Sequence, residues 1–380
     1  MKHPVYLDYN ATTPVDPEVL KEMIPYIESY YGNPSSSYSI GRSNKEAIEK
    51  ARGQVAELIN CKPEEIYFTS CATESNNLAI QGIARANSKR GRHIITSAIE
   101  HPAVTEVCKY LGSQGFEITV LPVDQYGRVD PGHAKEAIRP DTILITIMHA
   151  NNEVGTIQPI REIGAIAKEK KIIFHTDASQ SVGKIETDVN KLKVDLLTIA
   201  GHKLYAPKGI GVLYIRNGTL IEKLMHGAGQ EKEIRPGTEN VIQTVGFGKA
   251  CEIALRDFEQ NQLNMMISRD RLLDGLVSRL GNKVHINSKL ENCLPNTLSV
   301  AFENVSAHAL ASIISNNVLI STGSACHSGE TTISSVLQAM KLDFRTAAAT
   351  VRISTGKNST EEEIDFAIEV LNNAINKLLL

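Results

Sequence analysis

Short apolar runs alternate with helical patterns over residues 65–216. Seven of these runs predict strands, at residues 65–70, 93–97, 117–123, 142–150, 171–177, 195–201 and 211–216. Their apolar residues are continuous rather than alternating with polar ones, which is typical of strands buried on both faces. Because the strands alternate with helical segments, we expect a mostly parallel α/β sheet.

Helical periodicity predicts helices at residues 17–31, 43–60, 74–88, 102–113, 131–139 and 160–170. In the second of these, one apolar face is formed by Ala47, Ile48, Ala51, Val55, Leu58 and Ile59. Ser43, with Glu46 three residues later, predicts an N-cap with a capping box at the start of this helix.

The pattern changes after about residue 250. A long helix is predicted at 254–281, then a smaller α+β region with a strand near 297–303, and a last helix at 360–379. A chain of 380 residues exceeds what one compact domain usually holds. We therefore expect a large domain over 15–257, and a small domain formed by 258–380 together with 1–14.

Composition excludes several classes of protein. The 40 basic and 43 acidic residues are interspersed and give a net charge of −3, with no basic stripe for direct binding of nucleic acid. No apolar run is long enough to span a membrane, and the first residues, MKHPVYLDYNATTP, lack the apolar core of a signal peptide. The six cysteines show no CxxC spacing, so no metal site is predicted and we expect reduced thiols in the cytoplasm.

Polar side chains follow five of the predicted strands. In open α/β sheets, ligands bind outside the carboxyl ends of the strands, so these side chains are expected along one edge. They are Thr73, His101, Asn152, Asp177 with Gln180, and His202 with Lys203.

Each of these residues also has a simple structural interpretation. Thr73 or Asp177 could cap a helix, His101 and Asn152 could be turn residues, and Lys203 could extend to solvent. Together these interpretations need several coincidences at one edge. A single ligand with a phosphate, a protonated ring nitrogen, an oxygen substituent and an aldehyde accounts for all of them. Pyridoxal 5′-phosphate (PLP) has these parts, and its aldehyde requires a lysine such as Lys203 with a lowered pKa.

The chain resembles the NifS/IscS-type cysteine desulfurases of the class V aminotransferase family. The resemblance rests on YLDYNATTP, GNPSS, ATESNN, NNEVG, HTDASQ, GHK, RPGTEN and GSACHSG, which occur in the family's order through nearly the whole chain. It implies a PLP-dependent transferase (aspartate aminotransferase-like) fold, with a seven-stranded, mostly parallel sheet in a large domain and a smaller α+β domain. NPSSSYSIGR, LPNTLSVAF and ACHS are similar to the selenocysteine lyase branch.

The resemblance also implies the residues that bind the cofactor. Lys203 holds PLP and moves the Cα proton of the substrate, and His101 stacks on the ring and assists. Asp177 pairs with the ring nitrogen and Gln180 with the phenolic oxygen. The phosphate contacts are assigned to Ala72, Thr73, His202 and, from the neighbouring subunit of a homodimer, Thr238. Asn152 is expected to contact both the cofactor and the substrate.

For the substrate, the resemblance implies that Arg352, Asn152 and Asn33 bind the amino acid and that Cys326 accepts its sulfur as a persulfide. The reaction converts L-cysteine to L-alanine, and a protein acceptor then takes the sulfur for iron–sulfur clusters or thiolation. Selenocysteine lyase activity on L-selenocysteine, transamination and a catalytically silent scaffold are the alternatives. The intact Lys203, Asp177 and His101 set argues against a silent scaffold.

Cys326 lies in STGSACHSGETT, whose Gly, Ser and Thr content predicts a mobile loop. A charged His327 would lower the pKa of this thiol, although an incidental free thiol is the alternative. Cys71, at a strand end, is the other cysteine near the expected site.

Two positions depart from the family pattern. Ala200 stands where many members have a phosphate-binding serine, and Tyr38 where many desulfurases have histidine. The first removes a cofactor contact, and the second leaves the preference for sulfur or selenium open.

Overall fold

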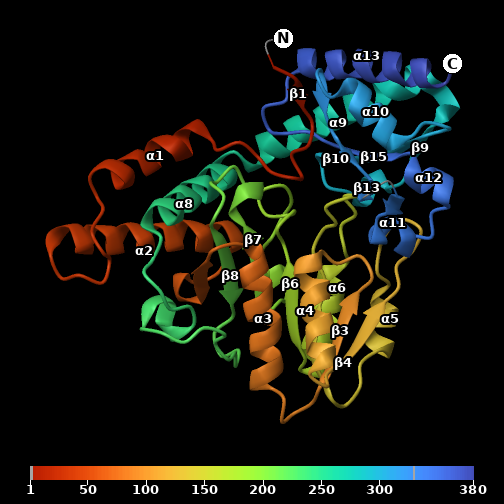
Figure 1. The fold of residues 1–380 in the computed structure, drawn as a ribbon. Coiled ribbons are helices and arrows are strands. Elements are labelled where there is room, and N and C mark those ends of the chain that lie inside the picture. The colour runs from red at the N-terminus through yellow and green to blue at the C-terminus, as the bar shows by residue number, and fades with distance from the viewer. Residues whose placement is uncertain (1–2, 328–329) are drawn as a thin grey trace.

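A seven-stranded sheet forms the centre of the larger part of the molecule (Figure 1). The computed structural model describes residues 3–327 and 330–380, with the backbone alone described for 324–327 and 330–332. The strand order is β2-β8-β7-β6-β5-β3-β4, and β8 alone runs antiparallel to its neighbours. The strands are β2 (Ile66–Thr69), β3 (His93–Ser97), β4 (Glu117–Leu121), β5 (Thr142–Thr146), β6 (Ile173–Asp177), β7 (Leu196–Ala200) and β8 (Gly211–Ile215). All seven predicted strands are confirmed.

Helices cover both faces of this sheet, which is why its strands are continuously apolar. On one face, α3 (Ala72–Ala86) and α4 (Pro102–Ser113) pack against side chains that include Ile94, Leu144 and Leu196. On the other face, α2 (Ser39–Ile59), α6 (Ile160–Lys170) and α8 (Val241–Arg256) pack against the neighbouring positions Ile95, Ile145 and Leu197. Successive side chains along a strand therefore belong to two different hydrophobic cores, one on each face of the sheet.

A separate core lies at the other end of the molecule, where both termini are found (Figure 1). It joins α9 (Phe258–Leu280), α10 (Ala307–Ile314) and α13 (Glu361–Leu378) to a four-stranded sheet of order β12-β15-β10-β9. Val5 and Leu7 from the N-terminal segment are buried in it, and β1 (Val5–Tyr6) pairs with β11 (Val318–Leu319). The expected boundary at residue 257 falls between α8 and α9.

The bounds of the remaining helices, and of the strands outside the large sheet, are as follows. The helices are α1 (Pro17–Glu28), α5 (Pro131–Glu136), α7 (Val189–Leu192), α11 (Ser335–Ala339) and α12 (Phe344–Ala348), with 3₁₀ turns η1 (Pro63–Glu65), η2 (Gly201–Lys203), η3 (Gln230–Glu233), η4 (Gly281–Lys283) and η5 (Leu290–Asn292). The strands are β9 (Val284–Ile286), β10 (Thr297–Phe302), β12 (Ser321–Thr322), β13 (Ser324–His327), β14 (Glu330–Ile333) and β15 (Thr350–Ser354). None of the helices in the described residues is long and apolar enough to cross a membrane.

Three local expectations were wrong. Helix α2 begins at Ser39 rather than after Ser43, and Asn44, in its second turn, ties this end of the helix to the preceding segment by donating to the carbonyls of Tyr30 and Gly32. The helix predicted at 254–281 is broken at Asp257, where α9 turns toward the second core. The segment expected as a loop around Cys326 forms the antiparallel pair β13–β14.

Candidate active site

A cavity of about 410 Å³ opens at the carboxyl edge of the large sheet. Its walls come from the ends of β6 and β7, the first turns of α3 and α4, and β15 of the second core. Nine of the predicted cofactor and substrate residues line it: Ala72, Thr73, His101, Asn152, Asp177, Gln180, His202, Lys203 and Arg352. The convergence expected from the strand ends is therefore present in the fold.

Lys203 lies in η2, the tight turn that directly follows the buried strand β7. Its Nζ donates to two backbone carbonyls of the N-terminal segment, Asn10 at 2.5 Å and Ala11 at 2.6 Å. Burial and the nearby Arg352 guanidinium lower the pKa of this ammonium to about 8. A lysine that loses its proton this easily is suited to attack an aldehyde.

Asp177 ends β6 and is almost fully buried, at 7 % exposure. One carboxylate oxygen accepts from the Asn76 side-chain amide at 2.7 Å, and the other accepts from the Ser179 backbone N–H at 2.9 Å. Among the described residues Asp177 forms no ion pair, and both of these hydrogen-bond donors are neutral. A protonated ring nitrogen in the cavity would supply the missing cation.

The first turn of α3 forms one end of the cavity. Its N-cap is Cys71, which makes no side-chain capping bond, so the N–H groups of the first turn have no cap within the described residues. Thr73 lies inside this turn and is not the cap, contrary to the structural alternative. Such a helix start binds phosphate.

His202 lines the same cavity, beside Thr12, whose hydroxyl is 3.1 Å from its Nδ1. Burial and the neighbouring Lys203 and Lys208 lower the pKa of His202 to about 4, so the ring is neutral at pH 7 and can donate one hydrogen bond.

His101 is the N-cap of α4, and its Nδ1 accepts from the Ala103 backbone N–H at 3.1 Å. This bond places the ring proton on Nε2 when the imidazole is neutral. Burial lowers the pKa of His101 below its ordinary value and so favours the neutral ring. The histidine is thus both a turn residue, as the structural alternative held, and part of the cavity wall.

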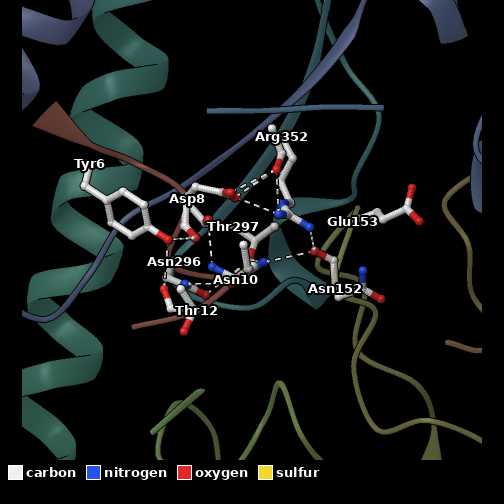
Figure 2. Close-up of polar contacts among 12 residues, drawn as sticks. Tyr6, Asp8, Asn10, Thr12, Asn152, Glu153, Asn296, Thr297 and Arg352 are labelled. Atoms are coloured by element: carbon white, nitrogen blue, oxygen red, sulfur yellow. Dashed lines mark hydrogen bonds and ion pairs between the residues drawn. The ribbon is translucent and has the colours of Figure 1, made fainter. Parts of the chain in front are cut away.

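Arg352 reaches the cavity from β15 and is held on two sides (Figure 2). Its Nη2 donates to the Asp8 carboxylate at 2.6 Å and to the Ser321 hydroxyl at 2.9 Å, and its Nη1 donates to the Asn152 carbonyl at 3.0 Å. Its Nε is buried without a partner among the described residues. A buried N–H without an acceptor is costly, so this atom marks a place for a ligand oxygen.

Of the other three predicted site residues, Asn33 and Thr238 do not line the cavity. Asn33 is exposed, and its side chain accepts from the Ser35 N–H in its own turn. Thr238 is also exposed, on the segment after η3. The backbone of Cys326 lies in β13, opposite Thr331 of β14, and its side chain lies outside the described part of the structure. The roles of these three residues stay predictions.

The structure adds four residues that sequence reasoning did not single out. Asn10 and Asn76 line the cavity, Asp8 holds Arg352, and Lys184 donates to both Asn10 and Gln180. Three of them lie inside motifs that were recognised as a whole: Asp8 and Asn10 in YLDYNATTP and Asn76 in ATESNN. For these three, membership of a recognised motif was the available signal.

The residues present fit PLP. The uncapped start of α3 suits its phosphate, and the unpaired Asp177 carboxylate suits a protonated ring nitrogen. Lys203, with its lowered pKa, suits the aldehyde. Two further buried polar atoms on the cavity wall, Asn76 Oδ1 and Ser179 Oγ, have no partner within the described residues.

Comparison with known proteins agrees with this chemistry. The family model "Aminotransferase class-V" matches residues 5–366. A protein from Methanosarcina thermophila named cysteine desulfurase IscS is 48 % identical, over 98 % of this chain and 92 % of its own length. Among solved structures, a NifS-like protein superposes with a TM-score of 0.93 at 42 % identity, covering 98 % of this chain and 100 % of its own.

A second solved structure, described as SspA in complex with cysteine, has a TM-score of 0.82 at 39 % identity and covers 93 % of this chain and 99 % of its own. The match of the family model extends over most of the chain, and the relatives are similar over nearly their whole lengths. The chain belongs to the aminotransferase class-V family.

Proposed function

We propose that this protein is a PLP-dependent cysteine desulfurase, which converts L-cysteine to L-alanine and transfers the sulfur to Cys326. The cavity carries this proposal, because it joins an easily deprotonated lysine, an unpaired carboxylate and an arginine with a free N–H. The relatives named cysteine desulfurase and the related structure that contains cysteine support the choice of substrate.

When bound, PLP withdraws electrons from the Cα of the amino acid and so stabilises the negative charge left there. Lys203 Nζ, which is neutral in part at pH 7–8, removes the Cα proton. Asp177 keeps the ring nitrogen protonated, and the neutral His101 lies near Lys203 to take or return a proton.

Arg352 and Asn152 hold the substrate carboxylate. The guanidinium is kept in place by Asp8 and by the Asn152 carbonyl, so its unpaired Nε–H can donate to a ligand oxygen without a change of rotamer. We keep Asn33 as a contributor to this end of the substrate, through movement of its turn or contact from a second subunit.

Sulfur transfer is assigned to the Cys326 thiolate. The thiolate attacks the substrate sulfur, the carbon–sulfur bond breaks, and the new sulfur–sulfur bond gives a persulfide. The carbon keeps the electron pair, takes up a proton and becomes the methyl group of alanine. The persulfide is then available to a protein acceptor, of an iron–sulfur scaffold or thiolation type.

The decisive test is alanine release from L-cysteine and L-selenocysteine, measured side by side with the holoenzyme. We expect release from L-cysteine, together with a persulfide on the protein detected by mass spectrometry. Alanine release from selenocysteine alone would assign the protein to the selenocysteine lyases, which Tyr38 and ACHS keep as the second candidate. Alanine release from neither substrate, by a yellow PLP-loaded protein, would overturn the proposal.

A homodimer and a cytoplasmic location complete the proposal. Thr238 is exposed and does not line the cavity of its own chain, which suits a contact to the phosphate in a partner subunit. The five cysteines whose side chains are described are all free, which suits a reducing compartment.

A further inference from the structure

Lys184 is a buried lysine whose hydrogen-bond partners are amide oxygens, and burial lowers its pKa to about 7. Its exposed fraction is 4 %, and among the described residues no carboxylate forms an ion pair with it. Its Nζ donates to Asn10 Oδ1 at 3.2 Å and to Gln180 Oε1 at 3.1 Å. Burying a lysine with neutral partners alone is costly, so the fold maintains this contact at the expense of stability.

The contact determines how the Gln180 amide is oriented. A lysine Nζ acts as a hydrogen-bond donor, so Gln180 must turn its oxygen toward Lys184 and its nitrogen away. Gln180 Nε2 then donates to the Asn10 carbonyl at 2.9 Å, the same oxygen that accepts from Lys203 Nζ. The amide nitrogen of Gln180 is therefore held beside Lys203, at the cavity wall.

Asn10 secures this arrangement from the second core. Its Oδ1 accepts from Lys184 and from Asn296 Nδ2 at 3.0 Å, and its Nδ2 donates to Thr297 Oγ1 at 2.8 Å (Figure 2). Asn10 is 1 % exposed. Lys184 thus contacts Asn10, which the second core holds in place, and Gln180, which lines the cavity.

We propose that Lys184 is a positioning residue for the phenolic oxygen of PLP, acting by fixing the Gln180 amide with its N–H groups toward the cavity. The proposal rests on the proposed function, in which Gln180 donates to that oxygen. Without Lys184, the Gln180 oxygen loses its donor, and the amide keeps only the contact of its nitrogen with the Asn10 carbonyl, so its N–H groups are held less firmly toward the cofactor oxygen.

The experiment compares Lys184→Met, Gln180→Leu and the double variant with the wild-type holoenzyme, with absorbance titration of the bound cofactor as the readout. Loss of one donor makes the phenolic oxygen more basic, so the titration midpoint in each single variant rises by about 0.4–1 pH unit, and PLP binds about 2- to 10-fold more weakly. Because Lys184 acts through Gln180, the double variant shows the shift of Gln180→Leu and no more.

Lys357→Met is the matched control, since Lys357 is a partly buried lysine that pairs with Asp16. It lowers the thermal stability but leaves the titration midpoint unchanged. Lys184→Arg, which retains donors, restores a midpoint close to that of the wild type. If Lys184→Met does not fold, Lys184→Gln replaces it, because its shorter side chain cannot reach both acceptors.

Each outcome decides one point. An unchanged midpoint in the Lys184 variants beside a shifted one in Gln180→Leu overturns the positioning role. Shifts that add up in the double variant overturn the route through Gln180. An unchanged midpoint in Gln180→Leu overturns the assigned contact of Gln180 with the cofactor, while alanine release by the wild type keeps the proposed function intact.

Discussion

Burial and, to a lesser extent, repulsion by Arg352 lower the pKa of the Lys203 ammonium to about 8. Attachment of PLP needs the neutral amine, whose fraction rises with pH through the pKa. We expect the rate of PLP attachment to the apoprotein to rise from about pH 7 and to level off above about pH 9. Absorbance after rapid mixing measures this rate.

An ordinary lysine, with a pKa of about 10.4, would give a rate that still rises at about pH 10, and that profile would contradict the assignment. Lys203→Ala is the control: borohydride then fixes no cofactor to the protein, and alanine release is lost. Turnover of the variant at the wild-type rate would rule out Lys203 as the proton carrier.

Arg352 is expected to bind the substrate carboxylate with two hydrogen bonds, which lysine cannot reproduce. Arg352→Lys should therefore lower kcat/KM by roughly 100-fold, on the basis of about 1.5–3 kcal/mol for a charge-assisted bond. Steady-state kinetics measure the loss, and the absorbance spectrum of bound PLP should stay the same. Loss of PLP from the variant would instead place Arg352 at the phosphate.

At the scale of elements, the start of α3 and the end of β7 are expected to bind the PLP phosphate. Ala200 lines it at 3 % exposure, where many relatives have serine according to the family resemblance. Ala200→Ser adds one hydroxyl donor, worth about 0.5–1.5 kcal/mol, and should tighten PLP binding about 2- to 10-fold in equilibrium dialysis. Thr73→Val should weaken it. Weaker binding by Ala200→Ser would show that the end of β7 lies away from the phosphate.

The β13–β14 pair presents Cys326 on a strand rather than on a loop. A selenol is more acidic than a thiol and its bond to carbon is weaker, so selenium leaves with less help from a nucleophile. Cys326→Ser should nearly abolish alanine release from L-cysteine and leave part of the release from L-selenocysteine, in an anaerobic assay. Undiminished turnover of cysteine would exclude Cys326 as the sulfur acceptor.

Sequence patterns predicted the elements that local chemistry determines. The seven strands were predictable because continuous apolar runs leave few alternatives in a sheet covered on both faces. The start of α2 was not predictable, because Asn44, near this end of the helix, bonds to carbonyls that lie more than ten residues away in the chain. The break at Asp257 depends likewise on where α9 packs, and a periodic sequence does not show that.

At the scale of the whole molecule, the cavity is completed by residues that the chain brings together from its far ends. Asp8 and Asn10 meet Arg352 and Thr297 across more than 280 positions (Figure 2). The strand-end residues were predictable because the sheet aligns them by a general rule. The contacts of Asp8, Asn10 and Lys184 were not, because they depend on how the N-terminal segment packs against the second core.

The exposed apolar side chains of α1 predict that this surface is covered by a second copy of the chain. Leu20, Ile24 and Ile27 are 52 %, 40 % and 56 % exposed, and Tyr31, just after the helix, is 80 % exposed. An apolar patch of this kind is unfavourable in water and marks an interface. We expect light scattering to report a dimer, and Ile27→Glu to shift it toward the monomer.

Ile313→Glu is the matched control, because Ile313 is also exposed, at 44 %, but lies on α10 in the other core. It should leave the dimer intact. If Thr238 reaches the partner's phosphate, the monomeric Ile27→Glu protein loses PLP, and Thr238→Val weakens PLP binding without changing the mass. A monomeric protein that keeps full PLP occupancy and activity would mean that each cavity is complete within one chain.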